Sequence, residues 1–177
     1  MHPFHFQRVQ ELGEHDFGPR RIFCEWLVQE PRRNILWTDE STFGRGGLFN
    51  VHNMHQWAAR NPHATRTDSY QHRFSVNVWA GVLNTVILGP VFLGRLNGAR
   101  YVQLLQSELE DMLEDIPLVH LRDLYFQHDG APAHFDVRAR TYLNRTYPGK
   151  WIGRIGPQAW PARSPDLTPL DFFLWGE

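Results

Sequence analysis

Short apolar runs separated by polar turns occupy the middle of the chain, and their spacing predicts strands. Residues 74–82 alternate apolar and polar side chains with a period of two, which is typical of a half-buried strand. Runs of three apolar residues at 35–37 and 124–126 predict two short buried strands, each followed at once by polar and acidic residues. Residues 86–93, as one strand or a bent pair, and 151–153 complete the expected set.

Apolar residues that recur every three to four positions predict the helices. The longest is expected to begin at Asn97, a favourable N-cap, and to end before Pro117. Others are expected at 16–27, at 135–146 and from Thr168 onward. The first of them is expected to bury one face, made of Ile22, Phe23, Trp26 and Leu27. The order of strands and helices predicts an α/β fold, with one mixed sheet flanked by helices on both faces.

Composition narrows the class of protein. With 177 residues and 42% apolar side chains, the chain is long enough for one compact domain and too apolar for a disordered protein. The formal net charge of −1 lacks the basic excess that non-specific phosphate binding needs. A single cysteine, Cys24, excludes an internal disulfide and a cysteine-based zinc site. The uncharged stretch 74–94 contains polar residues and a Gly-Pro pair, so strands explain it better than a membrane span.

Three acidic residues stand where predicted elements begin or end. Asp39 follows one buried strand and Asp129 follows another, so neighbouring strands would bring both carboxylates to one edge of the sheet. Asp171 stands in the first turn of the last helix, which can pack against that edge. Converging carboxylates repel unless a cation neutralises them, and Mg²⁺ and Mn²⁺ prefer oxygen ligands. The pattern predicts a two-metal site for phosphoryl transfer, in which Asp39 bridges the ions while Asp129 and Asp171 hold one each.

Other roles for these acids stay open at this level. An Asp after a strand also caps turns. Thr168 and Asp171 match the [ST]-x-x-[DE] capping box, with Pro169 at the first helical position. Asp166 competes as the third ligand, although its place after a Ser-Pro pair favours a local turn.

Four separated motifs carry a resemblance to one family. They are WTDESTF at 37–43, FSVNVWAGV at 74–82, QHDGAPAH at 127–134 and WPARSPDLTPLDFFLWG at 160–176. Together they are similar to the catalytic domain of mariner-like transposases, in the DDE/D superfamily, and the resemblance covers nearly the whole chain. It implies an RNase H-like fold. It also implies that the catalytic and metal-binding acids are Asp39, Asp129 and Asp171, the last being the final acid of its motif rather than Asp166.

The activity implied by this resemblance is that of a DNA transposase. It would hydrolyse DNA at transposon ends and then use the freed 3′-hydroxyl to attack target DNA, with two Mg²⁺ or Mn²⁺ ions. The expected partners are transposon-end and target DNA and a second copy of the chain in a homodimer. Neither a membrane nor a small-molecule cofactor is expected, and the expected location is the nucleus.

The motif positions divide the chain into two expected parts. Residues 1–33 are expected to be a helical lead-in, a linker to a missing N-terminal DNA-binding region. Residues 34–177 are expected to form the RNase H-like catalytic domain, incomplete in its last helix. Such a fragment is expected to have little activity alone. The alternative is a decayed or host-adopted remnant that binds DNA or protein without catalysis, although the presence of all three acids favours retained chemistry.

Residues 44–73 are the local candidate for contact with DNA or with a second subunit, and an exposed hairpin with a return strand at 48–52 is the alternative. Its phosphate partners would be Arg45, Arg60, Arg66 and Arg73. His128 and His134 flank Asp129 and are expected to hydrogen-bond carboxylates or DNA phosphate near the metals. The ten histidines do not predict structural zinc, because none forms a helical pair beside a partner acid.

Overall fold

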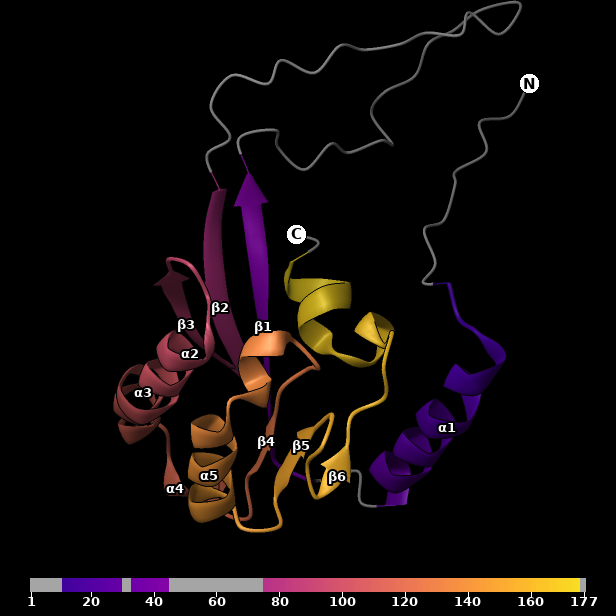
Figure 1. The fold of residues 1–177 in the computed structure, drawn as a ribbon. Coiled ribbons are helices and arrows are strands. Elements are labelled where there is room, and N and C mark those ends of the chain that lie inside the picture. Colours follow the sequence, from indigo (N-terminus) through magenta and orange to yellow (C-terminus); the bar gives the residue numbers. More distant parts are fainter. Residues whose placement is uncertain (1–10, 30–32, 45–74, 176–177) are drawn as a thin grey trace, which may run out of the picture.

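One mixed sheet organises the computed structural model, which describes residues 11–29, 33–44 and 75–175 (Figure 1). The order of the strands across the sheet is β3-β2-β1-β4-β5-β6. Their bounds are β1 Ile35–Gly44, β2 Ser75–Leu83, β3 Val86–Leu93, β4 Tyr125–Gln127, β5 Trp151–Gly153 and β6 Gln158–Ala159. The first three strands pair antiparallel, whereas β4 runs parallel to β1, β5 to β4, and β6 to β5.

The strands occur where the sequence predicts them, with one difference in length. The apolar run at 35–37 is only the start of β1, because antiparallel pairing with β2 continues from Leu36 opposite Leu83 to Gly44 opposite Ser75. The acidic residues that follow the run therefore lie within a strand rather than after it. Residues 86–93 form one strand, and the return strand expected at 48–52 lies outside the described residues.

The helices surround this sheet. They are α1 Glu14–Gln29, α2 Gly98–Gln103, η2 Leu104–Glu108, α3 Leu109–Glu114, α4 Leu118–Leu121, η3 Pro132–Phe135, α5 Val137–Thr146, η4 Pro165–Leu167 and η5 Leu170–Leu174. Asn97 is the N-cap of α2, since its side chain accepts a hydrogen bond from the Arg100 amide at 3.0 Å. The single helix expected up to Pro117 is instead interrupted by the wider π turn of η2. This turn places Leu104, Leu105 and Leu109, all fully buried, against the sheet.

Two hydrophobic clusters cover opposite faces of the sheet, because consecutive strand residues point to opposite sides. Leu36 and Phe126 pack with the α2–α3 and α5 side, and Ile35 packs with α1. Figure 1 shows α1 on one side of the strands and α2, α3 and α5 on the other. The buried face of α1 is narrower than the face expected from the sequence. Phe23 is 1% exposed, whereas Ile22, about a third of a helical turn away, is 60% exposed.

No helix among the described residues is both long enough and apolar enough to cross a bilayer. The uncharged stretch after residue 74 forms β2 and β3, as its polar interruptions predict.

Candidate active site

The register of two parallel strands brings Asp39 and Asp129 together. Ile35 of β1 lies opposite Tyr125 of β4, and Trp37 lies opposite Gln127. The same offset of 90 positions places Asp39 level with Asp129, just where β4 ends and β1 continues in its pairing with β2. Both residues therefore come to the same edge of the sheet, where they line one pocket.

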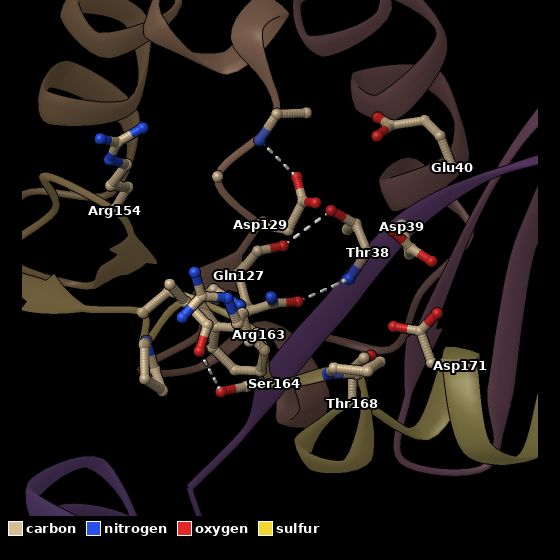
Figure 2. Close-up of a pocket in the computed structure, with 16 residues that line it drawn as sticks. Thr38, Asp39, Glu40, Gln127, Asp129, Arg154, Arg163, Ser164, Thr168 and Asp171 are labelled. Atoms are coloured by element: carbon tan, nitrogen blue, oxygen red, sulfur yellow. Dashed lines mark hydrogen bonds between the residues drawn. The ribbon is translucent and has the colours of Figure 1, made fainter. Parts of the chain in front are cut away.

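Side-chain hydrogen bonds extend the contact between β1 and β4 at this edge. The Thr38 hydroxyl donates to the main-chain oxygen of Gln127 at 2.7 Å, and the Thr38 amide donates to Gln127 Oε1 at 3.2 Å. Both residues are buried. These two bonds, drawn in Figure 2, fix the spacing of the strands one residue before the acids.

Asp171 approaches the same edge from the C-terminal part of the chain. Leu170 is fully buried, and η5 packs against β1 and β2. The Thr168 hydroxyl accepts a hydrogen bond from the Leu170 amide at 3.3 Å. In the described part of the chain the Asp171 carboxylate makes no reciprocal bond to Thr168, so the capping box expected as an alternative does not form. Asp171 lines the pocket instead.

Asp166, the competing third acid, has a different partner. Its two carboxylate oxygens accept hydrogen bonds from the Arg20 guanidinium of α1, at 2.9 and 2.5 Å. Arg20 also donates to the main-chain oxygen of Arg163 and to the Ser164 hydroxyl. Asp166 is thus part of the contact between α1 and the segment that leads to η5, and it does not line the pocket.

A single pocket of about 650 Å³ contains all three predicted acids. Figure 2 shows Asp39, Asp129 and Asp171 around it, from β1, from the loop after β4 and from η5 respectively. Two arginines, Arg154 and Arg163, line the same pocket. A polar hollow with several carboxylates and flanking guanidinium groups suits a cation and a phosphate-bearing ligand.

Two of the acids hold their protons unusually tightly. Burial, and then the nearby charge of Asp171, raises the pKa of Asp39 to about 7, although the Trp175 indole donates to Asp39 Oδ2 at 2.7 Å. Partial burial and the charge of Asp129 raise the pKa of Asp171 to about 6. Burial is the larger cause of both shifts, and repulsion from a neighbouring carboxylate adds to it.

Asp129 differs because a histidine lies against it. Burial by itself favours the neutral acid, yet hydrogen bonding to His134 and its positive charge hold the pKa of Asp129 below its usual value. His134 Nδ1 hydrogen-bonds the main-chain oxygen of Asp129 at 3.1 Å and lies 2.9 Å from Oδ1 of its carboxylate. His134 Nε2 lies 3.3 Å from Glu40 Oε1. Although burial disfavours its charge, these two acids raise the pKa of His134 to about 10.

Glu40 and Trp175 were not singled out from the sequence. Glu40 follows Asp39 on β1, lines the same pocket and meets His134. The only signal available for Glu40 was its place next to Asp39 in the acidic run after the apolar residues 35–37. No local pattern identifies Trp175 as the donor to Asp39, since the two residues are 136 positions apart.

The predicted DNA-contacting residues fall into two groups. The four arginines lie outside the described residues; they are Arg45, Arg60, Arg66 and Arg73. His128 and His134 are 2% and 4% exposed, so in this structure they contact protein and not a surface that DNA could reach. Of the two expected roles, contact with carboxylates or with DNA phosphate, His134 has the first, since it contacts Asp129 and Glu40. His128 Nδ1 lies 2.8 Å from the Tyr101 hydroxyl, and burial lowers the pKa of His128 well below its usual value.

Comparison with known proteins adds independent information. No family model matches the chain. It is 31% identical over 103 residues to the Tc3 transposase of Caenorhabditis elegans, a match that covers 58% of this chain and 28% of that protein. It superposes on the Mos1 mariner paired-end complex with Mn at a TM-score of 0.70 and 21% identity, covering 99% of this chain and 52% of that one. The crystal structure of the Mos1 catalytic domain gives 0.65 and 22%, covering 96% and 72%.

The fold is that of the Mos1 transposase catalytic domain, an RNase H-like mixed sheet with flanking helices. The resemblance of this chain to the catalytic domain of mariner-like transposases, indicated by its motifs, is confirmed. The chain spans about half the length of the Mos1 proteins in the paired-end complexes, and its match spans about a quarter of the Tc3 protein.

Proposed function

We propose that this chain is the catalytic core of a DNA transposase that uses divalent cations to cleave DNA at transposon ends and to join the freed 3′-hydroxyl to target DNA. The observation that carries the proposal is the convergence of Asp39, Asp129 and Asp171, from three separate elements, on one pocket. The Mos1 relatives support the substrate and the cation, because their structures contain a transposon end, Mn or Mg.

The residues present suit a hard divalent cation. All three predicted ligands are carboxylates, the ligand type that Mg²⁺ and Mn²⁺ prefer. Burial and neighbouring carboxylates raise the pKa values of Asp39 and Asp171, and a bound cation would favour their charged forms. We propose two ions here, with Asp39 as the shared ligand. When bound, such a pair activates the attacking water or hydroxyl and stabilises the leaving oxygen.

The protein's own groups would orient the ligands and the DNA. Trp175 holds one oxygen of Asp39 through its indole N–H. Arg154 lies over the ring of Phe135, 4.8 Å from its centroid, and lines the pocket, so its guanidinium is placed to contact a DNA phosphate. Arg163 is less available because it donates to Asp16 at 2.6 Å.

The test is Mn²⁺ binding by the 177-residue chain, measured by titration and by thermal denaturation, followed by a nicking assay on transposon-end DNA. Wild type is expected to be stabilised by about 1.4 kcal/mol at a Mn²⁺ concentration of ten times Kd. Asp129→Asn is expected to abolish the stabilisation. Asp111→Asn, on the exposed side of α3, is the matched control and should behave as wild type.

Equal melting temperatures with and without Mn²⁺ would contradict the proposal. Little or no cleavage by the 177-residue chain is expected, because such a core is expected to have little activity alone, and robust cutting at a defined transposon end would contradict that expectation. A homodimer and a nuclear location are parts of the same proposal. They are checked by analytical ultracentrifugation with transposon-end DNA and by imaging the tagged chain in cells.

A further inference from the structure

We propose that His134 and Glu40 are positioning residues that fix the Asp129 carboxylate relative to Asp39, so that one chosen oxygen of Asp129 faces the cation. The inference rests on the proposed function, because it requires Asp129 to be a cation ligand. It concerns the motifs TDES and HDGAPAH: the second supplies Asp129 and the histidine that contacts it, and the first supplies Glu40, which contacts that histidine.

The contacts of Asp129 leave its two oxygens in different states. Oδ1 accepts a hydrogen bond from the Ala131 amide at 2.9 Å and lies 2.9 Å from His134 Nδ1. Oδ2 has no hydrogen-bond partner among the described residues. His134 Nδ1 also hydrogen-bonds the main-chain oxygen of Asp129, so it restrains both backbone and side chain. The carboxylate can therefore rotate little, and Oδ2 is the oxygen left to bind a cation.

Glu40 connects this arrangement to β1. Its side chain is 12% exposed, and Oε1 lies 3.3 Å from His134 Nε2. Asp39 is its immediate neighbour on the same strand, and both residues line the pocket. The contacts from Glu40 through His134 to Asp129 thus connect Asp129 to β1, the strand that carries Asp39. This connection does not depend on the main-chain pairing of β1 with β4, which ends at Gln127.

Buried rings hold the histidine itself. The rings of His134 and His128 stack at 4.6 Å with an angle of 4° between their planes, and the Tyr101 ring lies 4.2 Å from His134 on the same cluster. The Tyr101 hydroxyl lies 2.8 Å from His128 Nδ1. A residue packed in this way has one available orientation, which is what a positioning role needs.

Glu40, Asp129 and His134 also offer ligand atoms within 4.8 Å of one another, the spacing of a three-ligand metal site. The geometry argues against that use. Both ring nitrogens of His134 lie at hydrogen-bond distance from an acid, on opposite sides of the ring, so each is occupied as a donor. Groups that hydrogen-bond a ligating carboxylate orient it and raise metal affinity without touching the ion.

The experiment measures Mn²⁺ affinity by titration on variants of the full chain that circular dichroism shows to be folded. Glu40→Gln, which keeps the side-chain shape, is expected to weaken Mn²⁺ binding about 10-fold, and His134→Asn about 10- to 100-fold. The double variant should bind no more weakly than His134→Asn alone, because both changes break one chain of contacts. Controls are Glu110→Gln, which accepts a hydrogen bond from Tyr142 away from the pocket, and His120→Asn on α4.

A second readout separates positioning from direct ligation. The electron spin-echo spectrum of Mn²⁺ bound to the wild-type chain is expected to show no nitrogen coupling from a coordinated imidazole. A strong coupling that His134→Asn removes would overturn the inference in favour of a His134 ligand.

The two proposals fail in different ways. If wild type binds Mn²⁺, Asp129→Asn does not, and Glu40→Gln and His134→Asn bind as wild type does, only the positioning inference is overturned. If wild type shows no Mn²⁺ binding that depends on Asp129, the proposed function fails and the inference fails with it.

Discussion

Asp39 and Asp129 are placed by adjacent strands, whereas Asp171 depends on contacts between segments at opposite ends of the chain. The strand pair is set by parallel register and by the buried Thr38–Gln127 bonds. The segment before Asp171 is held to α1 by side-chain ion pairs between residues 146 and 147 positions apart. We refer to Asp16, Arg20, Arg163 and Asp166 as the α1 ion-pair cluster.

The two kinds of support differ in strength. Buried hydrogen bonds are costly to break because the remaining partner has no water to bond. Ion pairs with one partner about half exposed, as Asp166 and Arg163 are, contribute less, since water and salt screen them. We therefore expect the strand pair to be the rigid half of the candidate site and Asp171 to be its adjustable half.

The strand half is tested with Thr38→Val, which keeps the side-chain shape and removes the hydroxyl donor. The buried oxygen of Gln127 loses its bond, so we expect about 1–3 kcal/mol of destabilisation in urea denaturation. Thr141→Val on α5 is the control, because its hydroxyl bonds a helical carbonyl at an exposed position. Equal losses for the two variants would contradict the rigid role of this contact.

The Asp171 half is tested with Arg20→Ala. Arg20 makes hydrogen bonds to Arg163, Ser164 and Asp166, yet Asp166 is largely exposed. We expect a loss of about 1 kcal/mol of stability. Mn²⁺ affinity should fall but not disappear, because Asp171 becomes less ordered while Asp39 and Asp129 stay in place.

Arg21→Ala is the matched control for Arg20→Ala, since among the described residues Arg21 pairs with Glu25, in an exposed contact within α1. Complete loss of Mn²⁺ binding in Arg20→Ala, as expected for Asp129→Asn, would show that the third acid is not the adjustable one.

The smallest expected effect is a pH dependence in the α1 ion-pair cluster. The Gly13 amide and then Arg163 hold the pKa of Asp16 below its usual value. The folded state therefore binds fewer protons here than the unfolded state, so the stabilisation is complete above the unfolded pKa of about 4 and is lost as pH falls. The difference in unfolding free energy between wild type and Asp16→Asn should be constant from pH 5 to 7 and shrink below pH 4. A difference that grows on acidification would contradict this assignment.

Much of the arrangement follows from the sequence because it depends on local order. Alternation predicts β2, helical spacing and Asn97 predict α2, and the polar ends of two apolar runs place Asp39 and Asp129 at one sheet edge. The motifs also distinguish Asp171 from Asp166; in the structure Asp166 pairs with Arg20, whereas Asp171 lines the pocket. The π turn at Leu104–Glu108 escaped prediction, because a single extra residue in a turn leaves the apolar spacing almost unchanged.

By itself, then, the amino-acid order determined which residues form strands and helices and which acids follow the short apolar runs, since these depend on neighbours a few positions away. Only the tertiary structure decided which side chains hold those acids: Trp175 against Asp39, and Glu40 with His134 against Asp129. Such contacts join residues separated by 94 positions or more in two of these cases, so no local pattern encodes them. They form because the sheet brings distant segments together and because a buried charged group is stable only when it is paired or hydrogen-bonded.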